Sequence, residues 1–398
     1  MKGKKYLGFV FMIILLLASP LVAAGAENVL KIGLVAPLTG AGAPWGLCFQ
    51  KTLQLEAEQY NAAGGLTMEG QKYKIEIVSE DDKYSPSEGV TVTNKLIFKD
   101  KVKFINGPVG SAVVLATRPA IEANEVISIV SSYTPKALTP DNKFTFRVHP
   151  SMGETIGPMF KWVMDNNPGI KKAGLLGPND ESGWSILAEY KFACKNLGFE
   201  VAAEDYFERN TTDYFPVLTR VLKNKPDILM LDAGTGDLGL ILKQARQLGF
   251  KGLTISSNPH DAGKLCKVAG KEGAEGHIHS GPHLVPGAIQ KWHDQFVARW
   301  KEWDSISILY GDNLDLMVAG IKQANSLDTK KVRSAMETVN FVSRFYGPVK
   351  LGGLKRYGMA HQLLVPVPIS QVKNCDNVGL VLAPPMEPFP PPEAAKKK

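Results

Sequence analysis

A glycine-rich segment follows the first apolar run of the mature chain, and its residue types could cradle a phosphate. It reads Thr39-Gly-Ala-Gly-Ala-Pro-Trp-Gly46. A dinucleotide site requires the spacing GxGxxG, whose glycines let backbone N–H groups approach a pyrophosphate. Here Trp45 occupies the place of the third glycine, and Pro44 lacks an N–H group. The spacing therefore argues against a nucleotide and predicts a turn that carries the Trp45 ring over a ligand cleft.

Hydroxyl groups follow two further apolar runs, in Gly107-Pro-Val-Gly-Ser-Ala112 and Ser131-Ser-Tyr-Thr-Pro135. Ligands of open α/β sheets bind at the carboxyl ends of strands, and helix N-termini attract anions. The two segments therefore indicate an anion site, although Ser111 could instead be a simple helix cap. No GxSxG elbow surrounds Ser111, and no base–nucleophile pair accompanies it. We therefore expect a binding protein and not an enzyme.

Two clusters of titratable residues could do other chemistry. The histidines of His277-Ile-His-Ser-Gly-Pro-His283 could share a strand face and bind a transition metal. Only Glu275 lies nearby to complete a ligand set, so we expect a solvated strand or linker and no metal. Glu80-Asp-Asp82 could be a paired acid–base site, but a solvated strand end is the simpler expectation. No cofactor is predicted.

The elements that must position these residues alternate between strand-like and helical patterns. Strands are predicted at 30–36, 74–78, 102–105 and 126–130, with helices at 49–61, 89–100 and 112–124. The alternation restarts after a break at 147–157, with strands at 173–176, 199–204, 228–232 and 253–256 and helices at 185–197, 215–224 and 238–248. Such an order predicts two α/β halves, each a parallel sheet covered by helices on both faces. Further helices are expected at 288–303, 305–326 and 330–338.

The formal net charge of +7 lies mainly at the two ends of the chain. Lys2, Lys4 and Lys5 contribute three of these charges, and the last three lysines contribute three more. The body between them is nearly neutral, and no basic face with interleaved aromatic residues is evident. Composition therefore gives no support for a nucleic-acid partner.

The first 26 residues have the pattern of a secretory signal peptide. The basic start is followed by an apolar run from Tyr6 to Leu17 and by Ala24-Gly25-Ala26, a small-residue cleavage site. The apolar run is shorter than the roughly 20 residues of a spanning helix. We therefore expect an exported mature protein. In an oxidising compartment, two disulfides in any of three connectivities, or buried thiols, are possible for Cys48, Cys194, Cys266 and Cys375.

Five short motifs occur in order along the mature chain. Together they resemble the leucine-binding protein family, the type I periplasmic solute-binding proteins of branched-chain amino acid ABC transporters. The resemblance extends over residues 29–380. It rests on Lys31-Ile-Gly-Leu-Val-Ala-Pro-Leu-Thr-Gly40, Asn61-Ala-Ala-Gly-Gly65, Glu80-Asp-Asp82, Ile105-Asn-Gly107 and Gln244-Ala-Arg-Gln-Leu-Gly249.

The resemblance implies two Rossmann-like lobes joined by three crossovers, with a ligand cleft between lobes that close by a hinge motion. The implied crossovers lie at 147–150, 277–282 and 351–357. We accordingly expect a signal peptide at 1–26, an N-terminal lobe at 27–147 plus 282–352, a C-terminal lobe at 148–281 plus 353–382, and a proline-rich, extended tail at 383–398.

The resemblance also implies roles for residues of the first lobe. Ser111 and Thr134 would hold the ligand's carboxylate, with N–H groups of Gly110 and Ser132 in support. Trp45 would cover the ligand's side chain.

The second lobe departs from the family pattern at three places. Ser182 stands where the family has a tyrosine, Gly234 or Thr235 replaces an aromatic residue, and Asn258 replaces the acid that pairs with an amino group. Losing that charge-assisted bond would cost about 1.5–3 kcal/mol. Trp184, Asp180 or Asp232 could compensate for the missing partner of the ligand's amino group.

The sequence therefore predicts a monomeric periplasmic solute-binding protein that delivers a small carboxylate-bearing ligand to the membrane permease of an ABC importer. A branched-chain or other amino acid is the default ligand. The alternatives are a non-amino carboxylate, including an aromatic one, and an exported ligand sensor. The identity of the ligand, the choice between transport and sensing, and the role of the tail stay open.

Overall fold

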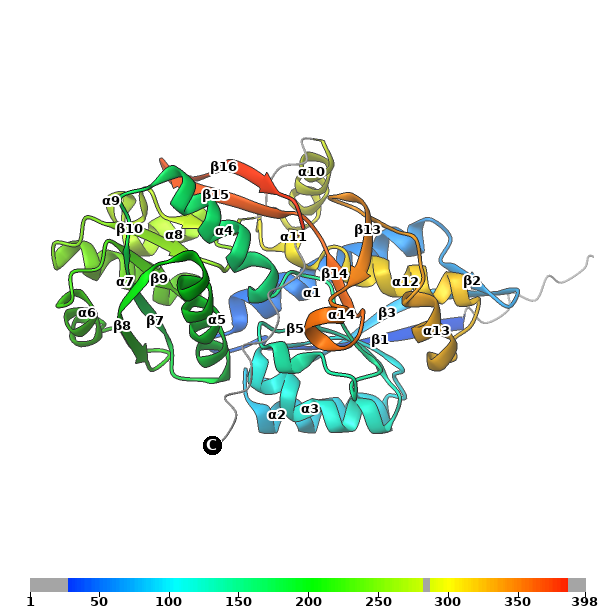
Figure 1. The fold of residues 1–398 in the computed structure, drawn as a ribbon. Coiled ribbons are helices and arrows are strands. Elements are labelled where there is room, and N and C mark those ends of the chain that lie inside the picture. Colours follow the sequence, from blue (N-terminus) through cyan, green and yellow to red (C-terminus); the bar gives the residue numbers. More distant parts are fainter. Residues whose placement is uncertain (1–27, 282–286, 386–398) are drawn as a thin grey trace, which may run out of the picture.

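Two sheets, each flanked by helices, lie side by side in the computed structural model (Figure 1). The structure describes residues 28–281 and 287–385. The expected signal peptide, His283 and residues 386–398 of the expected tail lie outside the described residues. We call the part built on the first sheet the N-terminal lobe and the part built on the second sheet the C-terminal lobe.

The sheet of the N-terminal lobe has nine strands in the order β12-β13-β14-β6-β5-β4-β1-β3-β2. Its centre, from β3 through β1, β4, β5 and β6 to β14, is parallel, and β2, β12 and β13 are antiparallel additions at its edges. The strands are β1 (Asn28–Ala36), β2 (Leu66–Met68), β3 (Gln71–Asp81), β4 (Phe104–Val109), β5 (Ile127–Ser131), β6 (Thr145–Arg147), β12 (Phe341–Ser343), β13 (Gly347–Gly352) and β14 (Gln362–Leu364).

The sheet of the C-terminal lobe has seven strands in the order β16-β15-β11-β10-β9-β7-β8. Its five parallel strands are β8, β7, β9, β10 and β11, in this order across the sheet. Strand β15 of the hairpin β15–β16 pairs with β11 in antiparallel orientation. The strands are β7 (Lys172–Pro178), β8 (Glu200–Phe207), β9 (Ile228–Leu231), β10 (Leu253–Ser256), β11 (Ile278–His279), β15 (Val367–Lys373) and β16 (Asp376–Ala383).

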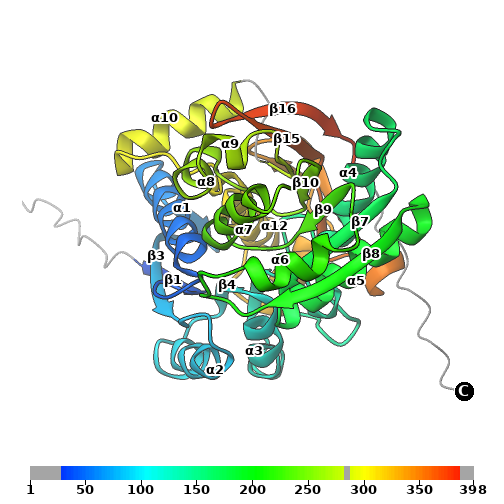
Figure 2. The same cartoon turned by 90° about the vertical axis from the view of Figure 1, so that its left-hand side faces the viewer.

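Helices cover both faces of each sheet, as Figure 2 shows from the end of the molecule. The N-terminal lobe carries α1 (Ala43–Ala62), α2 (Pro86–Asn94), the π-helical turn η1 (Lys95–Lys99), α3 (Ser111–Ala123), the 3-10 turn η2 (Pro135–Ala137), α10 (Ala288–Trp300), α11 (Ser307–Tyr310), α12 (Asn313–Ala324), α13 (Thr329–Met336) and α14 (Leu354–Tyr357). The C-terminal lobe carries α4 (Met152–Asn166), α5 (Glu181–Leu197), α6 (Phe215–Leu222), α7 (Thr235–Gln247), α8 (Ala262–Ala269) and α9 (Lys271–Ala274).

The central strands are buried on both faces, which is why they read as continuous apolar runs. In β1, Ile32 and Leu34 pack into the same core as Phe49 of α1, whereas Val35 packs with Ile105 and Leu96 on the other side. This alternation follows from the two-residue period of a strand. The parallel pairing of β1, β4 and β5 places their carboxyl ends at one edge of the sheet.

Three connections pass between the two sheets, and one of them differs from the prediction. The first follows β6 and the second follows β11. The third joins β14 to β15 at residues 365–366, and not at 351–357 as expected. Because β14 pairs with both β13 and β6, residues 362–364 belong to the N-terminal lobe's sheet. Ala383, the expected start of the tail, is instead the last residue of β16.

Two predicted helices also have different bounds. Helix α1 begins at Ala43, so Trp45 lies in its first turn and not in a loop before it. Pro44 suits this position because a first-turn N–H has no partner inside the helix. The helix expected at 305–326 is two helices, α11 and α12, separated at Gly311.

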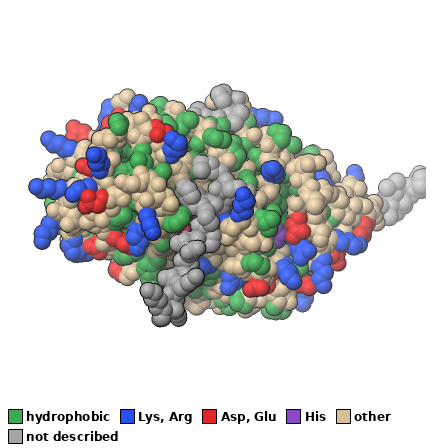
Figure 3. All heavy atoms as spheres, in the orientation of Figure 1, with side chains coloured by type: hydrophobic (Ala, Val, Ile, Leu, Met, Phe, Trp, Pro, Cys, Tyr) green, Lys and Arg blue, Asp and Glu red, His purple; other side chains and the backbone are tan. Residues whose placement is uncertain are grey.

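Charged side chains of both signs are interspersed over the face shown in Figure 3, in keeping with the nearly neutral body. Across the part of the chain that the structure describes, no helix combines the length and apolarity needed to cross a bilayer.

Candidate functional site

A cavity lies where the strand ends of both lobes meet. We call it the polar cavity. The N-terminal lobe contributes residues that follow β3, β4 and β5, and the C-terminal lobe contributes residues that follow β7, β8, β9 and β10. Its lining residues are Trp45, Tyr84, Val109, Gly110, Ser111, Ser131, Ser132, Tyr133, Ser182, Arg209, Asp232, Asn258, Leu309 and Tyr310.

Ser111 has a hydroxyl proton to offer inside this cavity. Its Oγ accepts hydrogen bonds from the Ser132 hydroxyl and the Thr134 N–H, each at 3.3 Å. Ser111 is only 1% exposed and begins helix α3, whose N-terminus favours negative charge. Since both contacts use Ser111 as the acceptor, its own O–H is free to donate. The arrangement suits a carboxylate oxygen.

Gly110 shapes the same wall but does not supply the predicted N–H group. That N–H donates to the carbonyl of Ser131 at 2.9 Å, so it has no hydrogen left for a ligand. Gly110 has a φ of 100°, and a Cβ there would lie 2.6 Å from the Tyr84 ring. Glycine is therefore required by backbone conformation and by the close approach of Tyr84.

Two aspartates after β3 hold the segments that carry the cavity's aromatic residues. Asp81 accepts hydrogen bonds from the Leu38 N–H at 2.8 Å and from the Thr39 hydroxyl at 2.6 Å. Asp82 is fully buried and accepts the Tyr84 N–H at 2.8 Å. Burial raises the pKa of the Asp82 carboxyl to about 7. The expectation of a solvated strand end is therefore wrong for Asp82, because this carboxyl organises a buried turn.

Hydrogen-bond acceptors line the opposite wall. Asp232, directly after β9, and Asn258, after β10, are 3% and 2% exposed. The Asn258 amide donates to Asp232 Oδ1, while Asp232 Oδ2 and Asn258 Oδ1 have no partner among the described residues. Burial raises the pKa of Asp232 to about 7, although the nearby Arg209 opposes this shift. Two unpaired buried acceptors facing a cavity are what an ammonium group requires.

Arg209 closes the cavity between these walls. Its Nε donates to Asp180 Oδ2 at 2.6 Å, and its guanidinium lies over the Tyr84 ring, 5.3 Å from the ring centroid. Asp180 also caps helix α5 by accepting the N–H groups of Ser182 and Gly183. This cation–π contact joins the two lobes across the cleft.

The remaining predicted site residues lie in different places. Ser182 lines the polar cavity, but Thr134, Gly234 and Thr235 do not. The Thr134 hydroxyl contacts Glu181 at 3.3 Å and Ser185 at 3.1 Å, so it joins the lobes. Gly234 and Thr235 line a recess on the other side of Trp45, which separates the two spaces.

Three residues that line the cavity are absent from the site residues predicted from the sequence, namely Tyr84, Asp232 and Arg209. Asp232 is one of the three residues that the sequence offers as compensation for the missing acid, whereas no role is predicted for Tyr84 or Arg209. Tyr84 lies two residues after the conspicuous Glu80-Asp-Asp82 motif, which was the available signal. Arg209 lies in a loop without any distinguishing pattern.

The histidine cluster is buried, which contradicts the expected solvated strand or linker. His277 and His279 are fully buried, as is His260. His277 contacts the hydroxyls of Ser256 and Thr254 at 3.1 and 3.0 Å. Within residues 28–281 and 287–385, no group of three or more His, Cys, Asp or Glu residues is arranged to hold a metal ion.

One disulfide joins Cys266 of α8 to Cys375 in the turn between β15 and β16. Cys48 and Cys194 are buried free thiols. The outcome combines the two possibilities, with one bridge within the C-terminal lobe and two buried thiols in place of a second bridge.

Two α/β lobes that enclose a polar cavity at their strand ends define a two-lobe solute-binding protein. Residues 29–376 match the family model of the periplasmic binding proteins, and the chain belongs to this family. It is of the leucine-binding-protein type, as the sequence resemblance predicted. The family indicates a periplasmic location.

Curated relatives support the same assignment. A leucine-, isoleucine-, valine-, threonine- and alanine-binding protein of Pseudomonas aeruginosa is 26% identical over 325 residues, which cover 79% of this chain and 84% of that protein. A Leu/Ile/Val-binding protein of Rhizobium johnstonii and an amino acid binding protein of Pseudomonas aeruginosa are further relatives, 26% and 24% identical over 250 and 272 residues.

Solved structures show the same fold. A leucine-binding protein of Thermotoga maritima has a TM-score of 0.76 at 22% identity, covering 89% of this chain and 99% of that one. A solute-binding protein of an ABC transporter from R. palustris, in complex with benzoate, has a TM-score of 0.77 at 22% identity, covering 90% of this chain and 97% of that one.

Proposed function

We propose that this protein captures an α-amino acid in the polar cavity and delivers it to the membrane permease of an ABC importer, without catalysing a reaction. The observation that carries the proposal is the opposition of two unpaired sets of groups. The Ser111 hydroxyl offers a donor for a carboxylate, and Asp232 Oδ2 with Asn258 Oδ1 offers acceptors for an ammonium group. The carboxylate and ammonium groups of an amino-acid zwitterion would pair with the donor and with the acceptors at the same time. The acid absent from position 258 is thus replaced in function by Asp232.

Contacts across the cleft support capture by lobe closure. Trp45 lies 3.6 Å from the position that a Cβ on Gly234 would take, and Lys136 pairs with Glu181 at 2.8 Å. The Thr134 hydroxyl contacts Glu181 as well. These residues come from different lobes, so a hinge motion at the three connections would break and remake the contacts. In this proposal the protein is exported by cleavage after Ala26 and works as a monomer.

A non-amino carboxylate is the second candidate, and one observation favours it. With a pKa near 7, the Asp232 carboxyl is largely uncharged in mildly acidic solution and then needs no ammonium partner. The benzoate complex of the R. palustris protein shows that this fold accommodates such a ligand. An exported sensor would use the same cavity and differ only in its protein partner.

The Ser111→Ala variant tests the proposed hydrogen bond to the ligand's carboxylate. We expect it to weaken amino-acid binding by about 1–3 kcal/mol, roughly 5- to 150-fold in dissociation constant, because a buried ligand oxygen loses its donor. Titration calorimetry at 25 °C measures the change. Ser128→Ala is the matched control: Ser128 is a buried serine of β5 that donates to the Gly107 carbonyl and does not line the cavity. Equal affinities of the wild type and Ser111→Ala would refute the assignment.

A further inference from the structure

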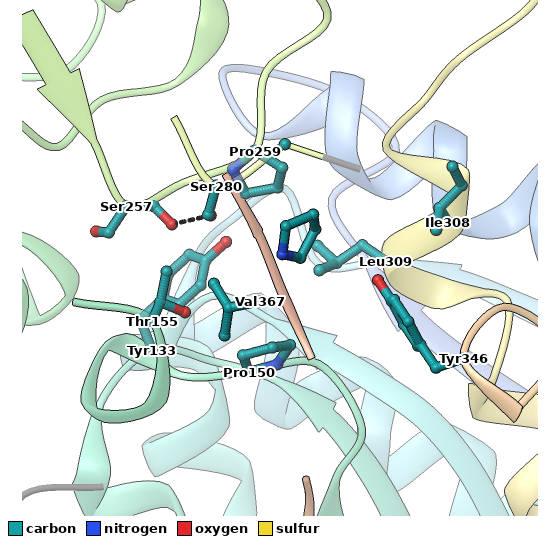
Figure 4. A pocket seen from close by; sticks show the side chains of 12 residues that line it. Tyr133, Pro150, Thr155, Ser257, Pro259, Ser280, Ile308, Leu309, Tyr346 and Val367 are labelled. Carbon is teal, nitrogen blue, oxygen red and sulfur yellow. Dashed lines mark hydrogen bonds between the residues drawn. The ribbon is translucent and has the colours of Figure 1, made fainter. Parts of the chain in front are cut away.

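A second cavity lies beside the polar cavity, at the hinge, and Figure 4 shows side chains that line it. We call it the hinge chamber. Its wall includes one residue at or next to each connection between the lobes: Pro150 in the first, Gly281 in the second and Val367 directly after the third. Both lobes also contribute side chains from their bodies, among them Ile308 and Pro259.

The wall of the hinge chamber is apolar. Three prolines, an isoleucine, a leucine and a valine line it, and no lysine, arginine, aspartate or glutamate does. The serine hydroxyls of the wall are already engaged: Ser280 donates to the Ser257 carbonyl, and Ser257 Oγ lies 2.7 Å from the Tyr190 hydroxyl. The chamber therefore offers apolar contact and no unsatisfied charge.

The hinge chamber and the polar cavity share two lining residues. Tyr133 and Leu309 line both spaces. Each is half-buried, although most of their neighbours along the chain are fully buried. Tyr133 follows β5 of the N-terminal lobe, yet its ring packs against the core of the C-terminal lobe. Leu309 belongs to the four-residue helix α11 and packs with the N-terminal core.

The side chain of Tyr133, which lines both cavities, makes an aromatic contact and no polar one among the described residues. Its ring meets the His149 ring edge-on, with centroids 5.4 Å apart, and its hydroxyl has no hydrogen-bond partner among the described residues. Rotating this side chain would break no polar contact that the structure shows.

We propose that the hinge chamber is the subsite for the far end of the ligand, and that the protein selects amino acids whose apolar side chain is longer than that of leucine. The proposal rests on the proposed function, which places the carboxylate and amino groups in the polar cavity. An unbranched or aromatic side chain reaches between Tyr133 and Leu309 into the chamber. Because Tyr133 and Leu309 line both cavities, a side chain that extends from the polar cavity past these two residues meets the apolar wall of the hinge chamber.

A length series tests the subsite. The probes are 2-aminobutyrate, norvaline, norleucine, 2-aminooctanoate and phenylalanine, titrated by calorimetry into the full-length mature protein. Each methylene that enters the chamber should tighten binding about three- to fourfold, the equivalent of about 0.8 kcal/mol. We expect this gain to continue past norleucine.

Two variants of Val367 give the matched comparison, because this side chain lines the hinge chamber but not the polar cavity. Val367→Phe fills the chamber and should weaken 2-aminooctanoate binding tenfold or more while leaving 2-aminobutyrate within threefold of the wild type. Val367→Ala enlarges the chamber and should shift the preferred length upward. If Val367→Phe does not fold, Val367→Ala and the wild-type series decide the question alone.

An affinity that stops rising at norvaline in the wild type, or a Val367 variant that changes short and long ligands equally, would overturn the subsite. The failure of the proposed function looks different. In that case no member of the series binds, or binding is indifferent to Ser111→Ala.

Discussion

At the scale of single residues, the polar cavity depends on hydrogen-bonding capacity that contacts within the described chain leave unused. Ser111 Oγ accepts hydrogen bonds and keeps its O–H available to donate, while Asp232 Oδ2 and Asn258 Oδ1 have no partner among the described residues. Sequence analysis identified Ser111 because a serine after an apolar strand and before a helix is a recognisable arrangement. It assigned Thr134 wrongly to the cavity, because the direction of a side chain in an irregular segment depends on the opposite lobe.

The Asp232 carboxyl predicts how affinity varies with pH. Its pKa of about 7 means that it gains charge as the pH rises from 6 to 8. A ligand with an ammonium group favours the charged form, so the affinity for an amino acid should rise about tenfold over this range. The deamino analogue favours the uncharged form, so its affinity should fall. Titration calorimetry of both ligands at pH 6, 7 and 8 measures the two slopes.

Asp232→Asn provides the control for this pH dependence. The amide cannot titrate, so both slopes should flatten between pH 6 and 8. Slopes that persist in Asp232→Asn would assign the titration to another group. Parallel slopes for the two wild-type ligands would contradict an amino-group contact at Asp232.

At the scale of elements, the parallel core of both sheets was predictable and its edges were not. Buried runs such as β5 and β9 have an unmistakable apolar pattern because helices cover both faces. The hairpin β15–β16 carries serine, glutamine, asparagine and glycine among its residues and lacks that pattern. The third connection was misplaced for a related reason, since β14 is three residues long and its partner β6 is distant in sequence.

The disulfide fastens this hairpin to helix α8, and its reduction should be costly. The bridge spans 109 residues of sequence, so it restricts the unfolded chain strongly. We expect Cys375→Ser to lower the free energy of unfolding by about 2–5 kcal/mol, as measured by denaturant titration. Dithiothreitol should do the same to the wild type and have no effect on the variant.

Ligand affinity is a second measurement, which shows whether the disulfide acts on stability alone. Neither Cys266 nor Cys375 lines the polar cavity, so the dissociation constant of Cys375→Ser should stay within threefold of the wild type under native conditions. An unchanged unfolding midpoint, with or without reductant, would show that the bridge does not constrain the chain.

At the scale of the whole molecule, two lobes of similar α/β architecture form two cavities between them, one polar and one apolar. The polar cavity lies at the strand ends, where the fold generally places ligands. The hinge chamber lies at the connections, which come from three distant parts of the sequence. The repeat of two α/β halves was legible in the sequence, whereas a cavity formed by residues 150, 281 and 367 exists only once the chain has folded.

The central claim is that the polar cavity binds a carboxylate-bearing amino acid. The most direct test is a thermal-unfolding screen that compares amino acids with their deamino analogues and with the corresponding amines at one pH near 7. An amino acid present at 100 times its dissociation constant should stabilise the protein by about 2.7 kcal/mol, and the matching amine should not. A screen in which no carboxylate raises the unfolding temperature, or in which an amine without a carboxylate raises it as much as the amino acid does, would contradict the claim.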